Sequence, residues 1–124
     1  ASIEYAVDHL GPKLIVVMGH ESCGAVKAAM TVPSSETAGS KDLDILLAAI
    51  RPNIGGNRAV ASDDPKLRGP ERSNVNAVAS DLYIRSKIVR TAVDRGGVKI
   101  VPAIYGIESG KAEFWSLAQP SKGH

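Results

Sequence analysis

The chain has 124 residues, 44% apolar and 23% charged, a composition ordinary for a globular domain with one core. Its 15 basic and 13 acidic residues are spread along the chain and leave a formal charge of +2, which argues against nucleic acid and membrane surfaces as partners. No apolar run reaches membrane-spanning length, and the only cysteine, Cys23, excludes an intramolecular disulfide. We therefore predict one domain over residues 1–124, located in the reducing cytoplasm.

The first elements are predicted to be a helix, a strand and a second helix. Ser2 is the expected N-cap of the first helix, and Gly11-Pro12 ends it. The uninterrupted apolar run 14–18 indicates a strand covered on both faces, as in parallel sheets. The next helix is expected to begin at Ser22 or Cys23. The first helix is predicted from four apolar residues at helical spacing: Ile3, Ala6, Val7 and Leu10.

The middle of the chain is predicted to hold a surface loop, a short helix and a second irregular segment. Residues 31–40 are rich in Ser, Thr and Pro, which favours a loop. Ser40 is the expected cap of an amphipathic helix that Arg51-Pro52 closes. Residues 53–70 combine several turn motifs and are expected to run over the surface.

The last part of the chain predicts a long helix, a strand and a hairpin. Helical spacing runs from residue 71 to 95, interrupted at Arg85-Ser86, and Gly96-Gly97 ends the pattern. A strand begins at Val98, where Pro102 indicates a bulge or an edge position. Residues 107–115 predict a turn and a return strand. Strands alternating with helices indicate an α/β fold with a mainly parallel β-sheet flanked by helices.

The chemistry-bearing motif is His20 and Cys23, three positions apart at the predicted strand-to-helix turn, where α/β proteins place their sites. A neutral imidazole and a thiolate are both good zinc ligands, and one tight turn lets them converge on one ion. The start of a helix also favours the thiolate. We predict that both residues ligate a metal; the alternative is a buried inert thiol beside a hydrogen-bonded histidine.

Gly24 follows the motif and has no side chain beside the predicted metal. Backbone can therefore approach a small ligand or anion closely, which predicts a substrate-binding position. The alternative is that this glycine only permits tight packing of helix against strand.

The segment from Gly19 to Val26 resembles the second half of the zinc signature of β-class carbonic anhydrases. Residues 2–7, Asn74-Val75 and 98–111 are similar to other parts of that family, so the resemblance covers nearly the whole chain. It implies the family fold and zinc-dependent, reversible hydration of carbon dioxide to bicarbonate. In that chemistry zinc lowers the pKa of its bound water towards ~7, and the resulting hydroxide attacks carbon dioxide.

The family also carries a Cys-x-Asp-x-Arg motif ahead of the half-motif, and this sequence has no second cysteine to supply it. A third zinc ligand and the Asp-Arg pair are therefore missing, so no catalytic residue is assigned and poor hydration is expected. The fold is predicted to be N-terminally truncated, because the chain is a fragment, a processed product or a short paralogue. The sheet edge left uncovered predicts a homodimer or higher homo-oligomer.

Other ligands and other functions remain open. Asp8, His9 and His124 have no motif support as further zinc ligands. One alternative function is a Cys23-dependent thiolate enzyme, although phosphatases of that type place an Arg six residues on, where this chain has Ala29. The second is a non-catalytic binding or assembly module in which Phe114 and Trp115 contact a partner, unless they pack on the core.

Overall fold

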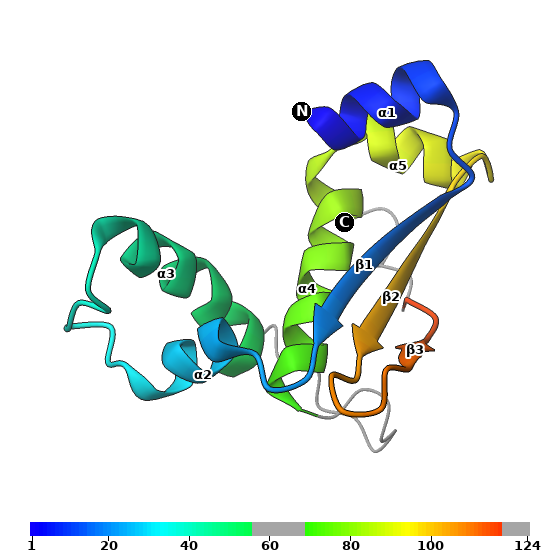
Figure 1. The fold of residues 1–124 in the computed structure, drawn as a ribbon. Helices are drawn as coiled ribbons and strands as arrows, with labels where there is room; N and C mark the ends of the chain where they lie inside the picture. Colours follow the sequence, from blue (N-terminus) through cyan, green and yellow to red (C-terminus); the bar gives the residue numbers. More distant parts are fainter. Residues whose placement is uncertain (56–68, 118–124) are drawn as a thin grey trace.

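A computed structural model describes residues 1–55 and 69–117 of the chain. Within these ranges it holds five helices and three strands in the order expected of an α/β protein (Figure 1). They are α1 (Ser2–Leu10), β1 (Leu14–His20), α2 (Gly24–Thr31), α3 (Lys41–Gly55), α4 (Pro70–Arg85), α5 (Lys87–Asp94), β2 (Lys99–Tyr105) and β3 (Ala112–Phe114).

The strands form one sheet in the order β1-β2-β3. β1 and β2 are parallel and in register from Leu14 opposite Lys99 to His20 opposite Tyr105. β2 and β3 are antiparallel over three residue pairs, against seven pairs in the parallel ladder. The predicted α/β fold with a mainly parallel sheet flanked by helices is confirmed, and β1 is an edge strand among the described residues.

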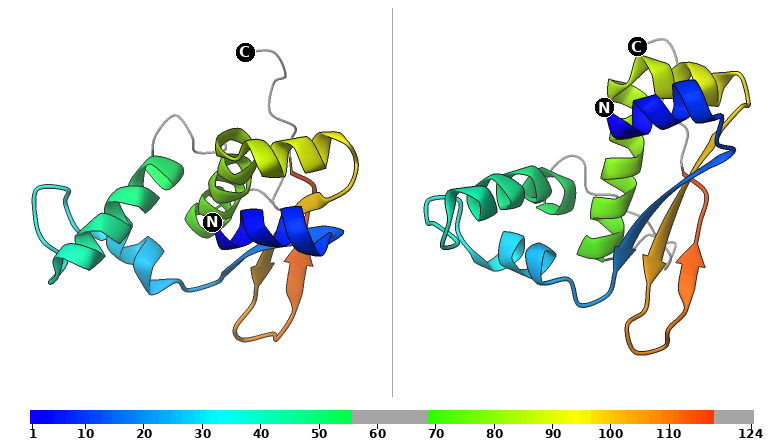
Figure 2. Two further views of the ribbon diagram at one scale, coloured as in Figure 1. Left: turned by 90° about the horizontal axis from the view of Figure 1, so that it is seen from above. Right: turned by 45° about the horizontal axis from the view of Figure 1, so that its top comes forward.

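The core lies on one face of the sheet, where α4 packs across β1 and β2. Ile15 and Val17 of β1 and Ile100 of β2 join buried residues of α4 and α5. Helices α1, α4 and α5 gather on this side in Figure 1 and in both views of Figure 2. Because side chains alternate along a strand, the remaining residues of β1 face the other side. Three of these are large and apolar, with exposed fractions of 52% for Leu14, 39% for Val16 and 50% for Met18.

Helices α2 and α3 form an arm that extends away from the sheet (Figure 1). The arm has its own small core of Val26, Ala29, Leu47 and Ile50. A hydrogen bond from Asn53 Nδ2 to Asn74 Oδ1, 2.9 Å long, joins α3 to α4. The chain therefore enters the arm from β1 at α2, and the end of α3 contacts α4.

Two helix boundaries differ from the sequence predictions. Ser2 is the first residue of α1 and the N-cap is Ala1, so the predicted cap is wrong. Helix α3 does begin beside Ser40, whose Oγ accepts a 3.1 Å hydrogen bond from the Leu43 amide. It does not end at Arg51-Pro52 but continues to Gly55. The last turn is held by packing of Ile54 on the arm core and by the Asn53 contact, which outweigh the penalty of Pro52.

The predicted interruption of the long helix is confirmed at Ser86, which separates α4 from α5. Its Oγ accepts a 3.2 Å hydrogen bond from the Val89 amide and so caps α5. The same hydroxyl donates a 2.6 Å hydrogen bond to Glu4 Oε2. Ser86 therefore separates α4 from α5, caps α5 and is hydrogen-bonded to α1.

Pro102 does not mark a bulge or an edge: it lies buried in β2, the central strand. Its carbonyl accepts a 3.1 Å hydrogen bond from the Trp115 amide, on the β3 side. The N–H and C=O of a strand residue face the same neighbour, so the missing N–H of Pro102 also lies on the β3 side. The parallel ladder with β1 stays intact, while the β3 ladder ends at Phe114.

Gly19 lets α4 approach β1, and its substitution tests that contact. A Cβ at Gly19 would lie 2.6 Å from Cγ2 of Val75, a buried residue of α4. We expect Gly19→Ala to lower the free energy of unfolding by about 1–3 kcal/mol in urea titrations, because the core must shift. Gly24→Ala is the matched control: a Cβ there meets nothing within 4 Å. Equal stability of the two variants would contradict the packing argument.

Candidate metal centre

The predicted ligands lie at the carboxyl end of β1, the end at which parallel sheets place their sites. His20 is the last residue of β1 and is exposed. Cys23 follows a two-residue turn and is the N-cap of α2, partly buried. The structure thus places His20 and Cys23 at the two ends of one turn between strand and helix, as the sequence predicts.

The helix after this turn begins slightly later than the sequence predicts: its first residue is Gly24, not Ser22 or Cys23. Ser22 adopts a left-handed conformation with φ of 55°, and Cys23 itself is the N-cap. The thiol makes no capping hydrogen bond. Cys23 therefore stands just ahead of the first helical turn and remains beside the unpaired amides at the helix start.

The imidazole of His20 is held by its own turn. Nδ1 lies 2.9 Å from the carbonyl oxygen of Glu21. A carbonyl only accepts, so this bond requires the proton on Nδ1. In the neutral imidazole Nε2 then keeps its lone pair. Metal-binding histidines use this arrangement, in which the second nitrogen donates to a carbonyl or carboxylate.

Backbone hydrogen bonds fix both ends of the turn. The amide of Glu21 donates to the carbonyl of Tyr105, 2.9 Å away, and so ties the turn to β2. The amide of Lys27 donates to the carbonyl of Cys23 at 3.0 Å, which is the first bond of α2. The positions of His20 and Cys23 are therefore set by the sheet on one side and by the arm on the other.

The fit of these residues to zinc is partial. Within residues 1–55 and 69–117, no group of three or more His, Cys, Asp or Glu side chains is placed to hold a metal ion. A catalytic zinc uses three protein ligands and a structural zinc uses four. Cys23 also packs against the arm core, so its sulfur is only partly accessible. His20 and Cys23 are thus half of a tetrahedral ligand set.

The other residues considered as ligands do not join this pair. Asp8 and His9 lie near the end of α1, which precedes the opposite end of β1, and His9 Nε2 is 3.5 Å from Asp8 Oδ2. His124 lies outside the described residues. Ala29 is buried in the arm core, so its position offers no phosphate contact of the phosphatase kind.

The space beside Gly24 is open. Because a Cβ built on Gly24 meets no atom within 4 Å, tight packing of helix against strand does not explain this glycine. The packing function belongs to Gly19, five residues earlier. Substrate binding at Gly24 stays a prediction.

Sequence reasoning missed the polar contacts that hold β3 against α4. Trp115 is buried and its Nε1 donates a 2.8 Å hydrogen bond to Asn76 Oδ1. The guanidinium of Arg72 lies 5.7 Å from the centroid of the Trp115 ring and 3.1 Å from a carboxylate oxygen of Glu113. Trp115 is therefore a core residue and not a partner contact, whereas Phe114 is half exposed. An aromatic residue next to a short strand gives no sequence signal for its amide partner 39 positions away.

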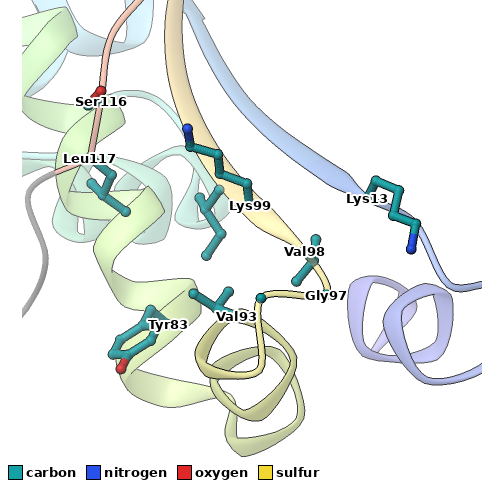
Figure 3. Close-up of a pocket in the computed structure, with 10 residues that line it drawn as sticks. Lys13, Tyr83, Val93, Gly97, Val98, Lys99, Ser116 and Leu117 are labelled. Carbon is teal, nitrogen blue, oxygen red and sulfur yellow. The ribbon is translucent and has the colours of Figure 1, made fainter.

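Figure 3 shows a cavity of about 490 Å³. It lies where β1 and β2 begin, whereas His20 and Cys23 lie where β1 ends. It is bordered by Lys13 before β1, by the Gly96-Gly97 turn, and by Tyr83 and Leu117. Tyr83 donates a 2.7 Å hydrogen bond to Asp94, and this bond raises the pKa of the phenol. The cavity contains none of the predicted site residues.

None of the helices in the described ranges is both long and apolar enough to cross a membrane.

Comparison with known proteins gives one consistent result. The family model described as carbonic anhydrase matches residues 1–112. The carbonic anhydrase of Mycolicibacterium smegmatis is 34% identical over 116 residues, which are 93% of this chain and 55% of that protein. Carbonic anhydrase 2 of Mycobacterium tuberculosis is 32% identical over 112 residues, 90% of this chain and 53% of the relative. The chain thus spans about half the length of these relatives.

Solved structures of β-carbonic anhydrases also resemble this chain. A structure described among two tetrameric β-carbonic anhydrases from the ascomycete Sordaria macrospora superposes with a TM-score of 0.67 at 27% identity, covering 90% of this chain and 56% of that one. The Coccomyxa β-carbonic anhydrase in complex with acetazolamide gives a TM-score of 0.65 at 26% identity, covering 98% and 54%.

The left-handed turn residue between the two predicted ligands provides a test of the site geometry. Ser22→Val is expected to lower the free energy of unfolding by about 1–3 kcal/mol, because a β-branched residue tolerates positive φ poorly. Ser22→Gly should keep the wild-type stability or exceed it, since glycine adopts this conformation without strain. Urea denaturation of both variants measures the difference. If valine proves as stable as glycine, the turn is not constrained as described.

Proposed function

Because the chain belongs to the β-class carbonic anhydrase family, we propose that it carries the His-x-x-Cys part of a zinc site for the reversible hydration of carbon dioxide to bicarbonate. One observation carries the proposal. His20 and Cys23 stand on the turn at the carboxyl end of β1, with the Nε2 of His20 left free by the Nδ1 hydrogen bond to Glu21. The family match over residues 1–112 supports the same function.

Each residue of the turn has a separate task in this proposal. His20 and Cys23 hold the zinc ion through nitrogen and sulfur. Gly24 leaves open space beside them for carbon dioxide or bicarbonate. The bonds from Glu21 to Tyr105 and from Lys27 to Cys23 keep the two ligands at a fixed separation.

The 124-residue chain is proposed to be a poor hydratase by itself. It has one cysteine and therefore lacks the Cys-x-Asp-x-Arg motif of the family resemblance. Without a third protein ligand the ion is held weakly. The Asp-Arg pair, whose Asp would orient the zinc-bound water by the family resemblance, is also absent from this sequence. No catalytic residue is assigned to this chain.

Self-association is part of the proposal. The solved relative from Sordaria macrospora is described as tetrameric. In this chain Leu14, Val16 and Met18 expose large apolar side chains on the edge strand of the sheet. Exposed apolar sheet surface of this kind favours burial against another protein surface. We infer a homo-oligomer.

The incomplete ligand set and the exposed side chains of β1 also favour a second candidate function. An incomplete ligand set together with an exposed apolar sheet face suits a binding or assembly module of the carbonic anhydrase fold that performs no catalysis. Such a module folds and self-associates but does not hydrate carbon dioxide.

Stopped-flow measurement of carbon dioxide hydration separates these functions. For the isolated chain with added zinc we expect a rate close to the uncatalysed rate and no loss on Cys23→Ser. Robust hydration that disappears in Cys23→Ser would show that His20 and Cys23 suffice and would contradict the proposed impairment.

Supplying the missing motif in trans tests the enzyme part of the proposal. A chain segment that carries the family's Cys-x-Asp-x-Arg motif is expected to raise the hydration rate of the wild-type chain, because it adds the third ligand. Cys23→Ser should remain at the uncatalysed rate under the same conditions. Failure of the segment to raise the rate, although it binds the chain, would favour the non-catalytic module.

A further inference from the structure

Another cavity, of about 470 Å³, lies where the arm meets the body of the molecule. Residues of α1, α3, α4 and α5 border it, and we call it the helix cavity. Figure 1 shows α4 at the centre of this region, with α3 to its left and α1 and α5 at its upper end. The helix cavity shares no described residue with the cavity beside Tyr83, and neither His20 nor Cys23 borders it.

Asn53 of α3 is the unusual residue of this wall. Only 5% of it is exposed, and its Oδ1 is a buried acceptor without a hydrogen-bond partner in the described part of the chain. The other end of the same amide is in use, because Nδ2 donates to Asn74 Oδ1 at 2.9 Å. Asn74 does not border the helix cavity, so this bond holds the amide with Oδ1 turned away from Asn74. Buried acceptors are nearly always paired in folded proteins, and this oxygen therefore indicates a missing donor.

Apolar side chains from all four helices form much of the remaining wall. They are Ile3, Ala49, Val78, Leu82 and Val89. Binding sites for small molecules are typically lined in this way, with a few polar groups that fix the orientation of the ligand. A ligand of the helix cavity therefore needs an apolar body as well as a donor for Asn53.

The charged side chains of the wall favour a positive ligand. Glu4 and Asp81 carry carboxylates and Arg85 carries a guanidinium, so negative side chains outnumber the positive one. The hydroxyl of Ser86 is not the donor that Asn53 lacks, because it donates to Glu4 Oε2 at 2.6 Å. An acceptor-rich wall of net negative charge attracts a cation with N–H groups and repels a carboxylate.

We propose that the helix cavity binds a small organic cation in which an amidinium or guanidinium group is attached to an apolar body. One N–H donates to Asn53 Oδ1, and the positive charge faces Glu4 and Asp81. The apolar body covers Val78 and Leu82. A planar group with several N–H donors suits this wall, since its acceptors come from three different helices. The proposal depends neither on zinc nor on the hydration of carbon dioxide.

Benzamidine is the probe that tests the proposal, and benzoate is its control. Benzoate has the same shape but carries the opposite charge and no N–H donor. In NMR titrations of the isotope-labelled chain we expect benzamidine to bind with a Kd of roughly 1 mM or lower, a range reasonable for a ligand of its size. The largest shifts should fall on the side-chain amide of Asn53 and on backbone amides of residues 78–86. Benzoate should bind about tenfold more weakly or not at all.

Two neighbouring alanines of α3 test the location of the site. Ala49 is exposed and borders the helix cavity, whereas Ala48 is exposed and does not. Neither belongs to the arm core, so a larger side chain at either position leaves that core intact. Ala49→Trp should abolish benzamidine binding, because the indole occupies the space of the ligand. Ala48→Trp should bind benzamidine as the wild type does.

Two further variants test the polar contacts. Asn53→Leu keeps the size of the side chain but removes the acceptor, so the affinity for benzamidine should fall about tenfold or more. Because this change also removes the bond to Asn74, circular dichroism must show that the variant is folded. Glu4→Gln keeps an acceptor for Ser86 and removes one negative charge, and it should weaken benzamidine about threefold or more.

Three results would overturn the proposal. They are benzamidine binding no tighter than that of benzoate, benzamidine binding that Ala49→Trp leaves unchanged, and no benzamidine binding by the folded chain. Shifts confined to the cavity beside Tyr83 would count with the second result, because they place the ligand elsewhere in the molecule.

Discussion

The approach of α4 to the carboxyl end of β1 is the constraint on which the rest of the molecule depends. Gly19 permits that approach, since any side chain there would overlap Val75. The contact fixes which face of β1 is covered, and with it the direction of every other residue of the strand. His20, the next residue, must then leave the sheet on the uncovered side. The chemistry of the turn is thus set by a packing contact one residue before it.

The turn connects the sheet to the arm of α2 and α3. On one side the Glu21 amide is bound to Tyr105 of the central strand, and on the other Cys23 opens the arm of α2 and α3. His20 belongs to the sheet and Cys23 to the arm, whose core is separate from the core under the sheet. Any ion bound by both therefore also braces the arm against the sheet, in addition to the Asn53–Asn74 contact.

Much of this fold follows from local sequence pattern, and the errors have physical causes. The strand at β1, the break at Ser86 and the return strand β3 were predictable because apolar periodicity and turn residues mark them. The end of α3 was not predictable, because it depends on the packing of Ile54 against the arm core. The position of Pro102 in the central strand was not predictable either, because it depends on which neighbouring strand its missing N–H faces. The His20–Cys23 turn was found from residue type, but the left-handed Ser22 and the cap at Cys23 needed the backbone.

Membership of the β-class carbonic anhydrase family explains the half-motif, and the chain spans about half of the relatives that define the comparison. The central claim is that His20 and Cys23 bind zinc together. X-ray absorption at the zinc edge tests it most directly. The account predicts sulfur at ~2.3 Å and imidazole nitrogen at ~2.0–2.1 Å from zinc in the loaded protein. A spectrum with oxygen and nitrogen neighbours alone, unchanged in Cys23→Ser, would contradict it.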